Sequence, residues 1–214
     1  MLKPRIAVLV SGGGTNLQAL IDARDAGKLK SGELALVVSG KTGAPALERA
    51  KRAGIACETV DRASFAAREA FEKRICRVLE RHKTDLIVLA GFMQILSADF
   101  VSRFPDRIVN VHPSLIPSYC GKGFYGIKVH EAVLAAGERW TGATVHMVNE
   151  VPDGGRILLQ KRVGVLEGDT PQTLQKRVME QAEWLLLPKA VEALCAEIAN
   201  QDEKRKRYET AGSL

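Results

Sequence analysis

The stretch RIAVLVSGGGTNLQAL, residues 5–20, joins an apolar run to a glycine-rich loop and then to a helical pattern. From Ile6 to Val10 the run contains no polar residue. A strand that is apolar on both sides is typical of a parallel sheet covered by helices on both faces, because only complete burial tolerates it. The stretch therefore predicts the first strand and helix of an α/β fold.

The same alternation is repeated through the first half of the chain. The apolar runs LALVV, ACETV and DLIVLAG are separated by the amphipathic stretches PALERAKRAG and SFAAREAFEKRICRVLERH. This order predicts a mostly parallel, twisted sheet with helices on both faces. Ligands of such sheets bind at the carboxyl ends of the strands, near a topological switch point, so the loops that follow the strands are the places to search for a site.

The pattern changes in the second half of the chain. RIVNV predicts one more strand, IKVHEAVLAAG predicts a helix, and TGATVHMV alternates with the period of a strand that has one more polar face. The triplet DGG, residues 153–155, separates TGATVHMV from RILLQKRVGV and predicts a C-terminal antiparallel hairpin. Residues 170–199 are expected to close the fold with a helix that has Thr170 as N-cap and Pro171 as its first residue.

Length and composition indicate one folded domain. Of 214 residues, 46% are hydrophobic and 26% are charged, the ordinary balance of a globular protein. We expect a single domain over residues 1–200 and a basic, flexible tail over residues 201–214. The net charge is +6, but EKRKR at residues 203–207 accounts for half of that excess, and no aromatic-rich basic motif accompanies it. Nucleic-acid binding is therefore not expected.

The N-terminus and the cysteines bear on the compartment. The continuous apolar run before Ser11, residues 6–10, has only five residues, too few for a signal peptide or a membrane span. The four cysteines are scattered and form no CxxC pair, so neither a disulfide framework nor a zinc site is indicated. We expect a cytoplasmic protein, a monomer or homodimer without membrane association, whose thiols are reduced and mostly buried.

The loop SGGGTN, residues 11–16, lies between a strand and a helix and predicts an anion-binding site. Backbone N–H groups at a helix N-terminus attract anions, and glycines let a ligand approach the backbone closely. The loop matches neither GxGxxG nor GxxxxGK[ST], which argues against dinucleotide and nucleoside-triphosphate binding. An ordinary tight turn between strand and helix would use the same glycines, so both interpretations stay open here.

The segment NVHPSL, residues 110–115, places two polar side chains at the end of a strand. Asn110 and His112 are two residues apart, so both emerge on one face of an extended chain. Pro113 biases His112 away from a helical conformation. Histidine transfers protons near neutral pH and an asparagine amide donates to a developing oxyanion, which together suit acyl transfer. A polar strand end that only caps its loop is the alternative.

Asp153 follows His146 by seven residues, at the glycine-rich turn of the predicted hairpin. A carboxylate there would hold the imidazole of His112 protonated or accept a proton through water. An ordinary turn also uses aspartate before glycine, and His146 by itself fits a hydrogen-bonded structural histidine. His82 and His130 lie in charged helical stretches and are expected at the surface. A metal held by His112, His146 and Asp153 is a minor alternative, since no HxxxH pair or cysteine supports it.

Together the segments SGGGTNLQAL, LAGFMQILSADFV, NVHPSLIPS, TGATVHMVNEVPDGG and EGDTPQTLQKRV resemble phosphoribosylglycinamide formyltransferase, a folate-dependent family of purine biosynthesis. The match runs in order from about residue 5 to about residue 190. It implies a formyltransferase fold with a Rossmann-like N-terminal half. It also implies direct transfer of the formyl group of 10-formyltetrahydrofolate, a co-substrate, to the amine of glycinamide ribonucleotide. The products are formylglycinamide ribonucleotide and tetrahydrofolate, without a metal or a covalent enzyme intermediate.

The resemblance also implies a role for individual residues. Asn110 polarises the formyl oxygen, His112 helps as a proton donor, and Asp153 supports the imidazole and moves a proton from the attacking amine to the leaving nitrogen. The substrate phosphate is expected on Gly13, Gly14, Thr15 and Asn16, and the rest of the substrate on Gly91, Met93, Pro113 and Glu183. The folate is expected on Met93, Gln94, Ile95, Leu96, Asn110, Val148, Asn149 and Asp153.

The sequence departs from the family pattern at three places. RVMEQAEWLLLP is one residue longer than the pattern, which leaves the match of Glu183 open. Gln94 stands where some members carry arginine, so a charge contact to the glutamate region of folate is absent or supplied elsewhere. The segment at residues 119–132 is longer than in the shortest members, and its Lys122 could contact an anionic tail.

Other functions remain as alternatives. Methionyl-tRNA formyltransferase and formyltetrahydrofolate hydrolase share the N-x-H and aspartate motifs, but each carries an additional domain that 214 residues would not accommodate. A non-enzymatic nucleotide-binding module would use the glycine loop and would not need His112.

Overall fold

Seven strands form one sheet in the computed structural model, which describes residues 3–211. The strand order is β3-β2-β1-β4-β5-β6-β7. Neighbouring strands from β1 to β5 are parallel, whereas β6 is antiparallel to β5 and to β7. The predicted parallel sheet and C-terminal hairpin are confirmed. The strands are β1 (Arg5–Val10), β2 (Glu33–Ser39), β3 (Ala56–Thr59), β4 (Leu86–Leu89), β5 (Ile108–His112), β6 (Trp140–Met147) and β7 (Ile157–Gly164).

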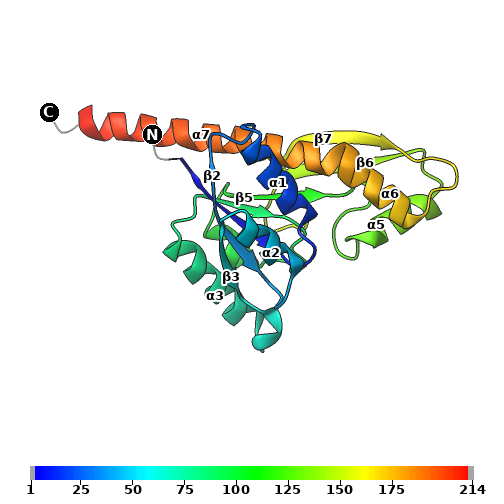
Figure 1. Cartoon of the computed structure of the whole chain (residues 1–214), viewed down its shortest axis with the longest axis horizontal. Helices are drawn as coiled ribbons and strands as arrows, with labels where there is room; N and C mark the ends of the chain where they lie inside the picture. Colours follow the sequence, from blue (N-terminus) through cyan, green and yellow to red (C-terminus); the bar gives the residue numbers. More distant parts are fainter. Residues whose placement is uncertain (1–2, 212–214) are drawn as a thin grey trace.

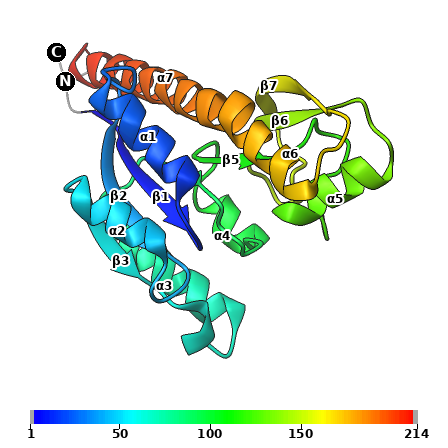
Figure 2. The same cartoon turned by 45° about the vertical axis from the view of Figure 1, so that its right-hand side comes forward.

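Helices connect the strands and cover both faces of the sheet (Figure 1). The longest helix, α7, crosses the molecule beside α1, and α5 and α6 lie near the β6–β7 hairpin (Figure 2). The helices are α1 (Thr15–Asp25), α2 (Pro45–Arg52), η1 (Arg62–Ser64), α3 (Arg68–Arg81), α4 (Ala98–Ser102), α5 (Ile127–Ala135), α6 (Pro171–Val178), η2 (Met179–Glu183) and α7 (Trp184–Ala211).

The side chains of β1 alternate between two cores, as the pleat of a strand requires. Ile6, Val8 and Val10 are buried in the core that α1, α2, α6 and α7 cover. Ala7 and Leu9 are buried in the second core, which α3 and α4 cover. Both faces of the apolar run that opens the chain are buried, as expected for an interior strand of the sheet rather than an edge.

The chain changes direction across the sheet at β1. It proceeds from β1 outward through β2 to β3, and then returns to the other side of β1 as β4 and continues to β5. The loops that follow β1 and β4 therefore diverge at their carboxyl ends and leave the crevice typical of a ligand site. The motif SGGGTN follows β1 and the motif GFMQIL follows β4, so both lie at this switch point.

The closing helical region differs from one continuous α-helix. Thr170 is the N-cap, with a capping box to Thr173, and Pro171 is the first residue of α6, as predicted. After α6 the backbone forms one π-helical stretch, η2, and then α7. The backbone stays helical over residues 201–211, where a flexible tail was expected, because Glu, Lys and Arg are good helix formers. Residues 212–214 of that segment lie outside the described residues, and the domain boundary at residue 200 stays a prediction.

Some expectations about buried groups need correction. Cys76 and Cys195 are buried free thiols, but Cys57 and Cys120 are only half-buried. His130, expected at the surface, is completely buried on α5, near enough to His112 for the charge of that residue to affect it. Burial lowers the pKa of His130 to about 4. Between residues 3 and 211, no helix combines the length and apolar character needed to cross a membrane.

Candidate active site

Asn110 and His112 lie at the carboxyl end of β5 and line one cleft, so the predicted common face is confirmed. The antiparallel register with β6 places Asn110 opposite His146 and His112 opposite Thr144. The pairing brings a second histidine beside the asparagine. His146 is buried, like His112, which is 5% exposed.

The DGG turn directs the carboxylate of Asp153 into this group. Asp153 adopts a positive φ of 56°, and a Cβ at Gly155 would lie 1.8 Å from the carbonyl oxygen of Met147, so only glycine fits there. The N–H of Gly121 donates to Asp153 Oδ2 at 2.9 Å. The turn is therefore fixed from both sides, by a close backbone approach and by a hydrogen bond from the loop that follows β5.

Asp153 lies between the other polar groups. Its Oδ2 is 3.5 Å from His112 Nδ1, and its Oδ1 is 3.5 Å from His146 Nε2. Asp153 Oδ1 is also 3.5 Å from Asn110 Nδ2. One carboxylate thus touches two imidazoles and one amide, drawn from β5, β6 and the turn after β6. The structure brings together all three residues for which the sequence suggested catalysis.

Hydrogen bonds to backbone carbonyls fix the ring protons. His112 Nε2 lies 2.8 Å from the carbonyl oxygen of Tyr119, which can only accept, so this nitrogen carries a proton and Nδ1 faces Asp153. His146 Nδ1 lies 2.8 Å from the carbonyl oxygen of Met147 and is protonated for the same reason. His146 Nε2 lies 3.2 Å from Asn110 Nδ2, from which it accepts when the ring is neutral, and 3.5 Å from Asp153 Oδ1, to which it donates when the ring is protonated. His146 therefore orients the amide of Asn110 so that the amide nitrogen also faces Asp153 Oδ1.

Burial dominates the electrostatics of the pair formed by His112 and Asp153. Burial lowers the pKa of His112 below its ordinary value, and the charge of Asp153 and the carbonyl of Tyr119 offset this only in part. Burial opposes ionisation of Asp153, but His146, His112 and the N–H of Gly121 together outweigh it and lower the pKa of Asp153. At neutral pH the free site thus holds an anionic carboxylate beside a neutral imidazole that is ready to accept a proton.

A buried hydroxyl supports the loop that carries Tyr119. Thr144 Oγ1 donates to the carbonyl oxygen of Ser114 at 2.7 Å and accepts from the N–H of Ile116 at 3.1 Å. Gln160 Nε2 also donates to Thr144 Oγ1 at 2.9 Å. Thr144 therefore ties the start of this loop to β6, directly opposite His112.

The cleft next to these groups has a volume of about 710 Å³. Two of its lining residues are large apolar side chains that stay exposed, Met93 (51%) and Ile95 (55%). Such exposed apolar groups beside polar ones are typical of a site for an organic ligand. The eight residues expected to bind folate all line it, together with Pro113: Met93, Gln94, Ile95, Leu96, Asn110, Val148, Asn149 and Asp153.

The glycine loop, residues 11–16, follows β1 and lies at the topological switch point, next to the loop that follows β4. Gly14 has a φ of 74°, and a Cβ there would lie 2.6 Å from Ala46 Cβ, so glycine is required for the close packing of α2. No side chain caps the N-terminus of α1, which leaves its first N–H groups for an anion. The N–H of Met93 donates to Ser11 Oγ at 3.1 Å, which joins this loop to the wall of the cleft. Gly91, one of the expected substrate residues, begins that wall with a φ of 71°.

Asn16 and Glu183 meet beneath the glycine loop. Asn16 Nδ2 donates to Glu183 Oε2 at 2.7 Å, so one hydrogen of the Asn16 amide is directed at η2. Thr15 Oγ1 is 3.8 Å from the sulfur of Met179. Burial raises the pKa of Glu183 to about 7, opposed by the hydrogen bond from Asn16. The π-helical stretch contains Glu183 and gives this turn one more residue than an α-helical turn, whereas the extra residue of RVMEQAEWLLLP against the family pattern stays a prediction.

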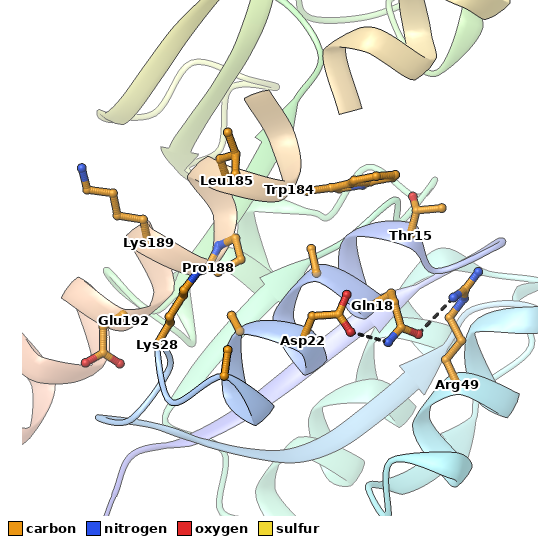
Figure 3. Close-up of a pocket in the computed structure, with 13 residues that line it drawn as sticks. Thr15, Gln18, Asp22, Lys28, Arg49, Trp184, Leu185, Pro188, Lys189 and Glu192 are labelled. Atoms are coloured by element: carbon orange, nitrogen blue, oxygen red, sulfur yellow. Dashed lines mark hydrogen bonds between the residues drawn. The ribbon is translucent and has the colours of Figure 1, made fainter. Parts of the chain in front are cut away.

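A second cavity of about 710 Å³ lies between α1 and α7 (Figure 3). Gln18 in its wall accepts from Arg49 at 3.0 Å and donates to Asp22 at 2.8 Å. Arg49 in turn donates to the carbonyl oxygen of Gly13 at 2.8 Å, which places a guanidinium beside the glycine loop. The residues that line this cavity include neither histidine nor cysteine, so it lacks the proton-transfer groups of the first cleft.

Sequence reasoning missed three contributions to the site. His146 was expected to be structural only, although its place opposite Asn110 makes it the partner that orients the amide. The carbonyl of Tyr119 and the hydroxyl of Thr144 had no local signal, because both act through a loop whose path depends on the fold. Among residues 3–211, no group of three or more histidine, cysteine, aspartate or glutamate side chains is arranged to hold a metal ion. The absence of a metal from the reaction stays a prediction.

Comparisons with known proteins agree with this geometry. The family described as Formyl transferase matches residues 4–191. The chain is 44% identical to the trifunctional purine biosynthetic protein adenosine-3 of Gallus gallus over 91% of its own length, but it spans only 19% of that relative. It is 42% identical to phosphoribosylglycinamide formyltransferase of Escherichia coli (strain K12), covering 82% of this chain and 80% of the relative.

Similarity extends to solved structures. The glycinamide ribonucleotide transformylase 1 of Symbiobacterium toebii superposes with a TM-score of 0.85 at 37% identity, covering 91% of this chain and 89% of that one. The matched range contains every residue of the two loops and the hairpin that build the cleft. On fold, matched length and identity, the chain belongs to the formyl transferase family, among the phosphoribosylglycinamide formyltransferases.

Proposed function

We propose that this chain transfers the formyl group of 10-formyltetrahydrofolate to the amine of glycinamide ribonucleotide, a step of purine biosynthesis. The observation that carries the proposal is the position of Asp153, 3.5 Å from His112, His146 and Asn110 in a cleft joined to the glycine loop. An amide, an imidazole and a carboxylate at one point are the groups that acyl transfer between two nitrogens requires.

The reaction breaks one C–N bond and forms another. The amine nitrogen of the ribonucleotide attacks the formyl carbon, and the carbonyl oxygen becomes an oxyanion. The Nδ2 hydrogen of Asn110 that faces Asp153 at 3.5 Å makes only a long contact, so it is available to donate to this oxygen. When the oxyanion collapses, the bond to N10 of the folate breaks and the formyl group stays on the amine.

One proton must travel from the attacking amine to the leaving nitrogen. Neutral His112 beside anionic Asp153 accepts this proton, and the resulting imidazolium is stabilised by the carboxylate. The positive charge lies next to the oxyanion and supports it. The imidazolium then donates the proton to N10, so His112 ends the cycle neutral and Asp153 stays ionised throughout.

The remaining pockets suit the two ligands. The N-terminus of α1 with Arg49 beside it suits the substrate phosphate, and Glu183 beneath it suits a ribose hydroxyl. The cleft along Met93 and the turn at Asp153 suits the folate. A cytoplasmic location, the absence of a nucleic-acid partner and a monomeric or homodimeric state are further predictions, which fractionation and light scattering would test.

A turnover assay tests the proposal. Purified protein is mixed with glycinamide ribonucleotide and 10-formyltetrahydrofolate, and tetrahydrofolate release is followed by absorbance. We expect release that depends on the ribonucleotide and a formylated ribonucleotide by mass spectrometry. His112→Ala should abolish most of the release, with Lys73→Ala, an exposed residue of α3, as the control. Release of free formate without an acceptor, or no release by folded protein, would contradict the proposal.

A further inference from the structure

Helix α2 holds the carbonyl groups of the glycine loop. The N–H of Ala46 donates to the carbonyl oxygen of Gly12 at 3.1 Å, and Arg49 Nε donates to the carbonyl oxygen of Gly13 at 2.8 Å. Ala46 also packs closely against Gly14, where a Cβ would lie 2.6 Å from the Cβ of Ala46. One side of the loop is therefore fixed by a single helix, through two hydrogen bonds and one close contact.

These bonds also fix the direction of the loop N–H groups. In a trans peptide the C=O and the following N–H point in opposite directions. With the carbonyl of Gly12 bonded to α2, the N–H of Gly13 points away from that helix, and the bond from Arg49 turns the N–H of Gly14 in the same way. Across residues 3–211 neither N–H donates to another group of the protein, so both are open to an anion at the N-terminus of α1.

The side chain of Arg49 is itself held in place. Its Nη1 donates to Gln18 Oε1 at 3.0 Å, and Gln18 Nε2 donates to Asp22 Oδ1 at 2.8 Å (Figure 3). Arg49 therefore connects α2, where its backbone lies, with α1 and the glycine loop. Both of its acceptors are uncharged, and within residues 3–211 the guanidinium forms no ion pair with a carboxylate.

We propose that Arg49 is a positioning residue for the substrate phosphate, an inference that rests on the proposed function. Its hydrogen bond to the carbonyl of Gly13 sets the plane of the peptide between Gly13 and Gly14, and this plane aims the N–H of Gly14 at the phosphate. The residue acts through the loop, so the donor at its ε nitrogen matters more than its charge. Without this donor the peptide can rotate, and phosphate binding must also order the loop.

Two neutral variants of matched length separate the donor from the charge. Arg49→Gln keeps an N–H donor at the ε position, whereas Arg49→Met keeps the length and removes the donor. Steady-state kinetics are measured with glycinamide ribonucleotide and with glycinamide riboside, which lacks the phosphate.

We expect Arg49→Met to raise KM for the ribonucleotide about ten- to hundredfold, the range for loss of a hydrogen bond from a charged group. Arg49→Gln should recover most of this loss. KM for the folate and kcat/KM for the riboside should not change in either variant, because neither depends on the phosphate.

A matched control and a measurement without turnover complete the experiment. Arg52, exposed on the same helix, donates to the carbonyl of Glu48 within that helix, so Arg52→Met should match wild type. In NMR spectra, the backbone amide signal of Gly14 should shift on titration with inorganic phosphate in wild type and Arg49→Gln, and much less in Arg49→Met. If Arg49→Met does not fold, Gln18→Leu removes the acceptor of Nη1 and should raise KM for the ribonucleotide in the same direction.

Three results would overturn the inference. Equal losses in Arg49→Gln and Arg49→Met would assign the effect to the charge or to direct contact with the phosphate. A matching loss of kcat/KM with the riboside would indicate a general structural defect, and a Gly14 signal that phosphate does not shift in wild type would remove the anion from this loop. Absence of turnover with either acceptor in folded wild-type protein, with the Gly14 signal still responding to phosphate, would instead overturn only the proposed function.

Discussion

Replacing Asn110 with alanine removes the side-chain amide that contacts both His146 and Asp153. The imidazole of His146 loses its donor, and the oxyanion loses the hydrogen bond that we assign to the amide. Asn110 sits at the end of β5 with its backbone paired to β6, so the strand itself should be retained. The substitution therefore tests the chemistry of the amide more than the fold.

The magnitude follows from the role of the amide. A donor that acts mainly on the oxyanion contributes about 2.7–4 kcal/mol to the transition state, which corresponds to a loss of about 10²–10³ in kcat. Because the ground-state formyl oxygen is uncharged, KM for either substrate should change little. The substitution also leaves His146 Nε2 as a buried acceptor without a donor, which should lower the free energy of unfolding by about 1–3 kcal/mol.

Stopped-flow or steady-state absorbance measures kcat and KM, and urea denaturation measures stability. Asn200→Ala, an exposed change on α7, is the matched control. Asn110→Asp keeps the shape but presents oxygen atoms to the oxyanion, so it should be at least as slow as Asn110→Ala. A folded Asn110→Ala protein within tenfold of the wild-type kcat, or an Asn110→Asp protein that restores the rate, would refute the reasoning.

Three further outcomes are expected. Asp153→Asn should lower kcat by about 10²-fold or more, far more than it weakens binding of glycinamide ribonucleotide in calorimetry, since an amide cannot stabilise the imidazolium. The raised pKa of Glu183, about 7, means that the folded state holds a proton which the unfolded state releases above about pH 4.5, so unfolding free energy falls as pH rises from about 5 to 7.5. Urea titrations should show this fall, roughly 3 kcal/mol, in wild type relative to Glu183→Gln. Asp169→Ala should cost about 2–3 kcal/mol in urea denaturation, because the Asp169 carboxylate pairs with both terminal nitrogens of Arg177. A matched loss on Arg177→Ala and little additional loss in the double variant would identify this pair as the source.

β1, β2, β4 and β5 could be predicted because their apolar runs report on burial, whereas β3, at the edge of the sheet, is only partly buried. Ile6 to Val10 allow only a central, doubly covered strand, and the structure places β1 there. The β6–β7 hairpin could be predicted as well, because the DGG turn lies between two strand-like runs. Local patterns of this kind are read directly from the sequence.

The partnership between Asn110 and His146 could not be read locally. It depends on the register between β5 and β6, which is set by the long segment between them and by Thr144. A shift of one residue would have directed His146 to the opposite face. His130 shows the same limit, because it is completely buried although charged residues surround it in the sequence.

The wide turn at η2 has a consequence for how this helical region tolerates length changes. An extra residue in a regular α-helix rotates everything after it by about 100°, which would turn the apolar stripe of α7 out of the core. In a π turn the added residue bulges locally, so Leu174 and Val178 before it and Leu187 and Val191 after it share one hydrophobic core. A residue added at this turn would thereby be absorbed next to Glu183 without changing the phase of the long terminal helix.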